Sequence, residues 1–328
     1  MTTGHGELMT AVRGPLSEDA QIDVPASRSE YQCVDDILEE EYETTGQKFP
    51  RLQYDGVRRV AIVCGPPSPL HGTMVGMLMT KVYNAVNQAP GVSRDISDRV
   101  SIKFPQTNAT LNDGGELIVR IWDGALEYFT GVGRAELMVA FEVGISRSYE
   151  KLRAAISFSV CALHSNLGIA MSVNEDKSYT KPPIQRYATF EEMNTAIKEM
   201  EQALRSQWRA CPYGPLIAND VTWFGKISNV VLETFRQEDR NYRPDTLLIP
   251  TQSFTIVEDG KFIGENVPSN LAELTIGDCI PTHILRDRNI ASIPLDFFNR
   301  DWFEVNFSWS MMEIAMNRVH EVCEFQPV

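Results

Sequence analysis

The sequence has few long apolar runs, which are typical of segments directed into or across a membrane. None of its 328 residues fall in an unbroken run of eighteen apolar residues, and the start MTTGHGELM has neither a basic flank nor an apolar stretch. The sequence therefore predicts no transmembrane segment and no signal peptide. Its six cysteines are scattered and form no C-x-x-C pair. This cysteine usage is typical of reduced thiols, so we expect a cytoplasmic protein or one in a similarly reducing compartment.

A phosphate-binding motif is also missing. The segment Gly65–Thr73 links an apolar run, Val57–Cys64, to a helical stripe, which is where a phosphate loop would lie. Its spacing is G-x6-G-T instead of G-x4-G-K-[ST], it has no lysine, and Pro66, Pro67 and Pro69 remove N–H donors. G-x-G-x-x-G is absent as well. A rigid structural loop is therefore favoured over nucleotide binding.

Nucleophilic catalysis has little support from the residue types. There are five histidines and no G-x-S-x-G motif. His71 and Cys64 are close enough in sequence to form a Cys–His pair, but a thiol buried in a strand has a raised pKa and is inert. We therefore predict no catalytic residue and no cofactor-binding residue.

A zinc site is the remaining chemical hypothesis. Cys279 with His283, and His320 with Cys323, could supply two sulfurs and two imidazoles to one tetrahedral ion. Two distant segments would have to converge for this, and the spacings differ from those of common zinc fingers. We therefore predict no metal ligand, no bound cofactor and no nucleotide hydrolysis.

The acidic charge is concentrated near the N-terminus. The net charge is −14, and residues 1–50 hold eleven acidic and three basic residues, a net charge of −8, so the rest carries −6. An acidic chain repels a phosphate backbone, so nucleic acid is not expected as the main ligand.

Residues 1–50 differ from the rest in having no sustained hydrophobic period. Val34–Tyr42 alone could form a short helix. We interpret the segment as an acidic arm that is mobile or bound to a partner; the alternative is an arm folded over its own domain. On the first interpretation, the arm is dispensable for folding and matters for association.

The segment from about Val100 to Val173 has the pattern of consecutive strands. Apolar residues alternate over Glu136–Val143 and over Ala154–Leu163, which predicts strands with one buried face. Further strands are expected at Val100–Phe104, Glu116–Trp122 and Leu167–Val173, and a helix at Thr73–Val86. We therefore expect an α+β protein in which residues 51–181 form a β-rich, antiparallel, sandwich-like or barrel-like domain.

After Pro182-Pro183, residues 182–328 are expected to form a mixed α+β domain. A capping box at Thr189 and Glu192 precedes an apolar helical stripe, which is formed by Met193, Ile197, Met200, Leu204 and Trp208. A second helix is expected at Val221–Phe235, and a hairpin at Phe254–Ile263 around Asp259-Gly260. Short strands are expected at Ala291–Leu295 and Phe303–Phe307. A last helix is expected after a capping box at Ser310 and Glu313.

Three features could belong to an interaction surface, and the first two are short enough to occur by chance. They are the tyrosine–leucine pattern Tyr149–Leu152, the proline loop Pro66–Pro69, and the aromatic group of Phe297, Phe298, Trp302 and Phe303, for which core packing is favoured over an interface.

Two functions follow as hypotheses. The first is a non-enzymatic structural or assembly protein, such as a viral coat or matrix component, which forms homo-oligomers or docks on other proteins. The alternative is an enzyme or nucleotide-binding protein with a dispersed site near Gly65–Thr73. A deep cleft that gathers His71, Cys64 and carboxylates would favour the alternative.

Overall fold

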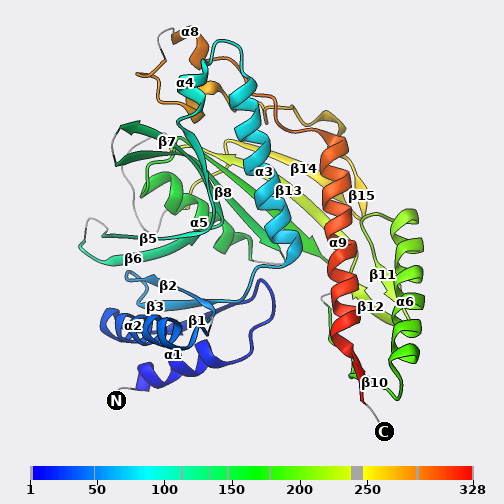
Figure 1. The fold of residues 1–328 in the computed structure, drawn as a ribbon. Helices are drawn as coiled ribbons and strands as arrows, with labels where there is room; N and C mark the ends of the chain where they lie inside the picture. Colours follow the sequence, from blue (N-terminus) through cyan, green and yellow to red (C-terminus); the bar gives the residue numbers. More distant parts are fainter. Residues whose placement is uncertain are drawn as a thin grey trace.

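A five-stranded and a seven-stranded sheet organise the chain in the computed structural model (Figure 1). The structure describes residues 3–47, 49–111, 114–131, 133–145, 148–176, 179–237, 247–285 and 288–326. The helices are α1 (Thr3–Arg13), α2 (Arg28–Thr45), α3 (Pro69–Gln88), α4 (Arg94–Ser97), α5 (Tyr149–Cys161), α6 (Phe190–Ala210), η1 (Gly264–Asn266), α7 (Ile276–Cys279), α8 (Arg288–Ala291) and α9 (Arg300–Val322). The strands are β1 (Gln21–Pro25), β2 (Arg51–Asp55), β3 (Val60–Cys64), β4 (Val100–Lys103), β5 (Gln106–Leu111), β6 (Leu117–Trp122), β7 (Gly124–Gly131), β8 (Arg134–Ile145), β9 (Leu167–Glu175), β10 (Gln185–Tyr187), β11 (Leu216–Ala218), β12 (Val221–Phe224), β13 (Ile227–Phe235), β14 (Gln252–Glu258), β15 (Lys261–Phe262) and β16 (Cys323–Phe325).

The acidic arm is folded onto the five-stranded sheet, whose order is β1-β3-β2-β6-β5 and whose pairs are all antiparallel. Ser27 and Glu30 form a capping box at the start of α2, and Gly46 ends it in the left-handed conformation. Helices α1 and α2 lie beside this sheet at the N-terminal end of the molecule (Figure 1). The described part of the arm therefore adopts the second alternative, an arm folded over its own chain.

Apolar contacts hold the arm in place. Leu8, Val12 and Val34 of the two helices are buried in one cluster with Tyr54 of β2 and Val63 of β3. The charged residues of α2 lie on its exposed side, which is why the segment has a high net charge and still packs.

The seven-stranded sheet has the order β15-β14-β13-β9-β8-β7-β4. Its pairs are antiparallel except for β8 and β9, which are parallel. A parallel pair needs a crossover connection, and α5 supplies it. The expected strand at Ala154–Leu163 is therefore wrong, because this segment lies in the crossover helix and its end. Apolar residues alternate in this segment because Ile156, Phe158 and Val160 are all buried. Helix α5 therefore lacks the amphipathic period that would identify it as a helix.

Both faces of β8 are buried, which corrects the expectation of one exposed face. Val139 and Phe141 pack in the main core with α3, while Ala140 packs with α5. Even Glu142 is only 2% exposed. Helix α5 covers the small and polar residues of the second face of β8. The large and small side chains therefore alternate along β8, while burial does not.

The expected helix at Val221–Phe235 is also wrong, because the segment forms β12 and β13. It is rich in β-branched residues, and Gly225 interrupts it between the two strands. β13 pairs with both β9 and β14 inside the seven-stranded sheet. The sheet and its core therefore draw on residues from both sides of the predicted boundary at 181/182.

Two features of the C-terminal part are confirmed. Helix α6 starts at the Thr189–Glu192 capping box; Ile197, Met200 and Leu204 are buried, while Met193 and Trp208 are half-buried. Strands β14 and β15 form the hairpin, and Asp259 and Gly260 both have positive φ, as a type I′ turn requires.

Three short-range expectations in this part are wrong. Phe303–Phe307 lies inside α9, and Ser310 and Glu313 are interior residues of that helix, which Asn299 caps instead. Ala291 ends α8, and the only pairing described for Ala291–Leu295 is an isolated bridge from Pro294 to Thr275. Phe303 and Phe307 both face the core from one side of α9, one helical turn apart, so this short apolar run is part of a helix and not a strand.

The fold is thus mixed α and β, with antiparallel sheets, one mixed sheet and a short parallel pair of β10 and β16. Neither of the two larger sheets closes into a barrel within the described residues, since each has two different end strands. None of the helices in the described ranges combines the length and apolar character needed to cross a membrane.

The buried stripe of α6 gives a stability prediction. We expect Leu204→Ala to lower the free energy of unfolding by about 2–5 kcal/mol, because Leu204 is fully buried against the core. Denaturant unfolding measures the loss. Gln202→Ala, at an exposed position of the same helix, is the matched control and should change stability by less than about 0.5 kcal/mol. A loss below about 1 kcal/mol for Leu204→Ala would contradict the core assignment.

Candidate functional site

The loop after β3 positions His71 at the start of α3. Ser68 is the N-cap, and its side chain accepts a hydrogen bond from the backbone N–H of His71 at 3.2 Å. Pro69 occupies the first turn of the helix, where its missing N–H costs little. The proline loop therefore begins a helix and fixes where His71 lies.

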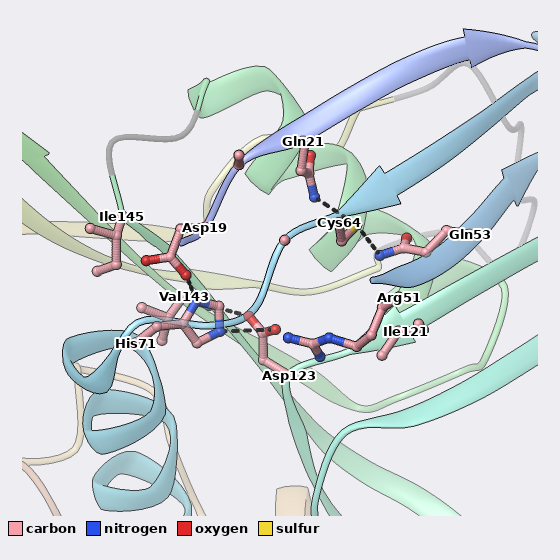
Figure 2. A pocket seen from close by; sticks show the side chains of 12 residues that line it. Asp19, Gln21, Arg51, Gln53, Cys64, His71, Ile121, Asp123, Val143 and Ile145 are labelled. Carbon is pink, nitrogen blue, oxygen red and sulfur yellow. Dashed lines mark hydrogen bonds and ion pairs between the residues drawn. The ribbon is translucent and has the colours of Figure 1, made fainter. Parts of the chain in front are cut away.

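Two carboxylates from distant segments flank the His71 ring (Figure 2). Nδ1 lies 3.1 Å from Oδ1 of Asp19, in the loop between α1 and β1, and Nε2 lies 3.0 Å from Oδ1 of Asp123, between β6 and β7. Both carboxylates are also held by the backbone. The N–H of Ser68 donates to Asp19 at 3.1 Å, and the N–H of Val143 donates to Asp123 at 2.9 Å.

This arrangement fixes the charge of His71. Burial lowers the pKa of the imidazole, but Asp123 and then Asp19 outweigh it and raise the pKa to about 10. His71 is therefore an imidazolium at neutral pH, with an N–H donated to each carboxylate. A ring with no free nitrogen lone pair cannot accept a proton, so the geometry suits an ionic link better than a general base.

A small cavity of about 40 Å³ adjoins this cluster. The Nε2 groups of Gln21 and Gln53 lie 3.5 and 3.3 Å from Sγ of buried Cys64, and Arg51 extends toward Asp123 (Figure 2). The cavity does gather His71, Cys64 and carboxylates, as the alternative hypothesis requires. Its volume suits a few water molecules, whereas ligand sites span roughly 300–1,000 Å³.

A larger groove of about 760 Å³ lies on the other side of Asp19. Its walls are the arm loop 15–20, Pro66 and Ser68 of the proline loop, the C-terminal ends of β8 and β9, and one side of α9. Its volume falls in the range of small-molecule and peptide sites. Of these two cavities near Gly65–Thr73, only the groove is large enough for an organic ligand.

Arg318 of α9 is a largely buried cation in the wall of this groove. Its Nη1 donates to the carbonyl of Trp223 at 2.7 Å, and its guanidinium lies 4.3 Å from the ring centre of Tyr179 and 5.6 Å from that of Phe224. Burial lowers the pKa of Arg318, and Glu175 is the first of the acidic groups that oppose this effect. The hydrogen bond to Trp223 and the contacts with the two rings hold the guanidinium of Arg318 in one orientation.

Carboxylates face Arg318 from other walls of the groove. Glu175, at the end of β9, accepts a hydrogen bond from the N–H of Gly225, and Glu18 lies in the arm loop. Burial raises the pKa of both carboxyls, and Arg318 works in the opposite direction on both. No direct ion pair joins either of them to Arg318 among the described residues.

The structure does not bring together the cysteine and histidine residues that were weighed, and not favoured, as zinc ligands. Cys279 is fully buried in α7, while His320 lies 3.0 Å from Glu201 on the surface of α9 and Cys323 lies beside Tyr187. Within the ranges that the structure describes, no three His, Cys, Asp or Glu side chains are placed to hold a metal ion.

The residues of the tyrosine–leucine pattern and of the aromatic group take part in internal packing and hydrogen bonds. Tyr149 donates a hydrogen bond to Glu233 at 2.9 Å, and Leu152 is buried, so the tyrosine–leucine pattern is the first turn of α5. Phe297, Phe298 and Phe303 are at most 6% exposed, which confirms that this aromatic group packs in the core.

His71 and Cys64 can be singled out in the sequence as candidate site residues, whereas Asp19, Asp123 and Arg318 cannot. Each comes from a different segment, and none has a local motif. The only available signal was the composition of α9, where an arginine follows a run of buried residues.

Comparisons with protein-family models, with curated proteins and with solved structures give no match for this chain.

Proposed function

We propose that the chain is a non-enzymatic assembly protein that pairs with a second copy of itself through the exposed side of α6 and α9. The observation that carries this proposal is a row of side chains on α9. Val305 is 65% exposed and Trp309 is 47% exposed, one helical turn apart. Neighbouring exposed apolar side chains on a soluble surface are typical of protein interfaces.

Helix α6 extends this surface, because it runs beside α9 at the edge of the molecule (Figure 1). The Trp208 ring meets the Trp309 ring edge-on at 5.7 Å, and Arg205 lies over Trp309 at 6.0 Å. The indole N–H of Trp208 is buried without a hydrogen-bond partner in the described structure. Tryptophan and arginine are the residue types that most often anchor interfaces.

The charges around this row support a second copy as the occupant. Asp301 and Glu313 are exposed on α9, one turn before Val305 and one turn after Trp309, whereas Arg205 and Arg209 lie on α6. A two-fold arrangement that places α9 of one copy over α6 of the other sets acids against bases in both halves.

The chemistry at His71 supports the non-enzymatic part of the proposal. Its imidazolium is engaged by Asp19 and Asp123, so this cluster offers neither a free base nor a free nucleophile-activating nitrogen. We propose as part of the same function that the chain is a structural component, such as a coat or matrix protein, and that its body is sandwich-like.

Sedimentation equilibrium over a range of protein concentrations tests the pairing. We expect the wild-type chain to dimerise, and Trp309→Ala to weaken the dimer at least about tenfold, as loss of an interface anchor does. Ile249→Ala is the matched control, since Ile249 is 79% exposed outside this surface. A wild-type chain that stays monomeric, or equal effects of both substitutions, would refute the proposal.

The groove supports a second candidate, a ligand-binding protein with its site beside Gly65–Thr73. The specific observation is the fixed guanidinium of Arg318 in a hollow of ligand size.

A further inference from the structure

The groove beside α9 is lined by side chains of both signs of charge. Arg318 supplies the positive charge from α9, and Glu175 and Glu18 supply negative charge from β9 and the arm loop. The acids act on Arg318 through space, but they make no direct ion pair with it among the described residues. Opposite charges kept apart across an opening leave room for a molecule that pairs with both.

An ion of one sign fits this groove poorly. An anion that approached Arg318 would also meet Glu175, Glu18 and Glu321, whereas a cation that approached the carboxylates would meet Arg318 and Lys181. The anion and the cation would each be attracted by one set of charges and repelled by the other, in a space that is partly shielded from water. A ligand that carries both charges on one small body avoids both repulsions.

Apolar and aromatic side chains form much of the remaining wall. Leu16, Ile145, Phe224 and Ile314 line the groove beside the charged residues. The hydroxyl of Tyr179, whose ring supports Arg318, is buried without a hydrogen-bond partner in the described structure. The site therefore combines an apolar surface, a fixed fork of N–H donors and an unsatisfied phenol.

We propose that the groove binds a zwitterionic amino compound with an apolar side chain, either a free α-amino acid or a short peptide. Its carboxylate pairs with Arg318, and its ammonium group pairs with Glu175 and Glu18. The planar guanidinium matches a carboxylate through two parallel hydrogen bonds. This inference rests on the second candidate function, and the self-pairing of α6 and α9 is independent of it.

Isothermal titration calorimetry on the full chain with leucine and with leucyl-leucine tests the proposal. N-acetylleucine lacks the ammonium charge and leucinamide lacks the carboxylate, and we expect each to bind at least about tenfold more weakly than leucine. The dipeptide separates the two sources, because tighter binding of leucyl-leucine identifies a peptide site and tighter binding of leucine identifies an amino acid site.

Two substitutions test which side chain pairs with the carboxylate of the ligand and which pairs with its ammonium group. Arg318→Gln should remove the preference for leucine over leucinamide, and Glu175→Gln should reduce the preference for leucine over N-acetylleucine. Glu175→Gln is nearly isosteric and keeps an oxygen that can accept from Gly225, so it preserves the local structure. Glu127→Gln, outside the groove, is the matched control and should leave every affinity unchanged.

Several outcomes would overturn the proposal. Binding of N-acetylleucine or leucinamide as tight as that of leucine would leave a ligand site but reject the zwitterion. Absence of heat with all four compounds would reject the class of ligand together with the site. Thermal unfolding of each variant, measured in parallel, separates loss of a charge from loss of the fold.

Discussion

Replacing His71 by glutamine should lower the free energy of unfolding by about 3–5 kcal/mol at neutral pH. The substitution removes a buried cation and leaves Asp19 and Asp123 close together without the charge between them. Breaking a buried ion pair by removing one partner has a cost of this size, because the remaining charge stays desolvated. Denaturant unfolding of the two proteins measures the difference.

His320→Gln is the matched control, since His320 also lies 3.0 Å from a carboxylate but is 54% exposed. Surface pairs of this kind contribute roughly 0–1 kcal/mol, so its effect should be small. If both histidine substitutions cost the same, the buried cluster around His71 has no special role in stability.

The pH dependence of the same difference follows from the raised pKa of His71. An imidazolium whose pKa rises from 6.5 in the unfolded chain to about 10 in the folded one contributes its full stability below pH 6.5. The contribution falls as pH rises toward 10, because the folded form then loses its proton. The gap between wild type and His71→Gln should therefore narrow steadily from pH 6.5 to 10; a gap that widens would reject the protonated assignment.

Deleting residues 1–47 should abolish cooperative folding of the five-stranded sheet. The deletion removes buried side chains such as Leu8, Val12 and Val34, and it uncovers Tyr54 and Val63. Each large apolar side chain contributes roughly 1.5–3 kcal/mol on burial, and a whole domain is stable by only about 5–15 kcal/mol. The truncated chain also loses Asp19 from the His71 cluster.

Circular dichroism during thermal unfolding tests this result, and removal of residues 1–6 is the control because it spares Leu8 and Val12. Retention of a wild-type transition after the long deletion would show that the arm is dispensable. That was the expectation from its charge and weak periodicity, and the packing of α1 and α2 reverses it. A separate role of the arm in association stays a prediction.

Local patterns predicted the elements whose burial is one-sided. Helix α6 has a capping box and a clean apolar stripe, and the β14–β15 hairpin has an Asp-Gly turn, so each could be identified without its neighbours. Elements buried on several sides were misassigned. Helix α5 covers β8 and β9 and is buried on all sides from residue 156 to residue 161, while β13 lies between two strands and loses its alternation.

The candidate site was less predictable because its groups come together only in the folded chain. His71 drew attention through the glycine and proline loop, but Asp19 and Asp123 are separated from it by long stretches of sequence with no motif. Arg318 lies in a helix that begins after Asn299, eleven residues before the apparent capping box at Ser310 that the sequence pattern favours. Its place beside Glu175 in the wall of the groove depends on how α9 packs against α3, α6 and β12, which no local pattern encodes.

The order of strands in the five-stranded sheet has a consequence for synthesis on the ribosome. β1, β2 and β3 leave the ribosome before β6 and can pair without it, since β3 lies between β1 and β2 in the sheet. β2 then carries an open edge until β6 has been made, because β6 is its second partner. Unpaired edges recruit other strands, so the nascent chain is most exposed to aggregation between the emergence of β3 and that of β6.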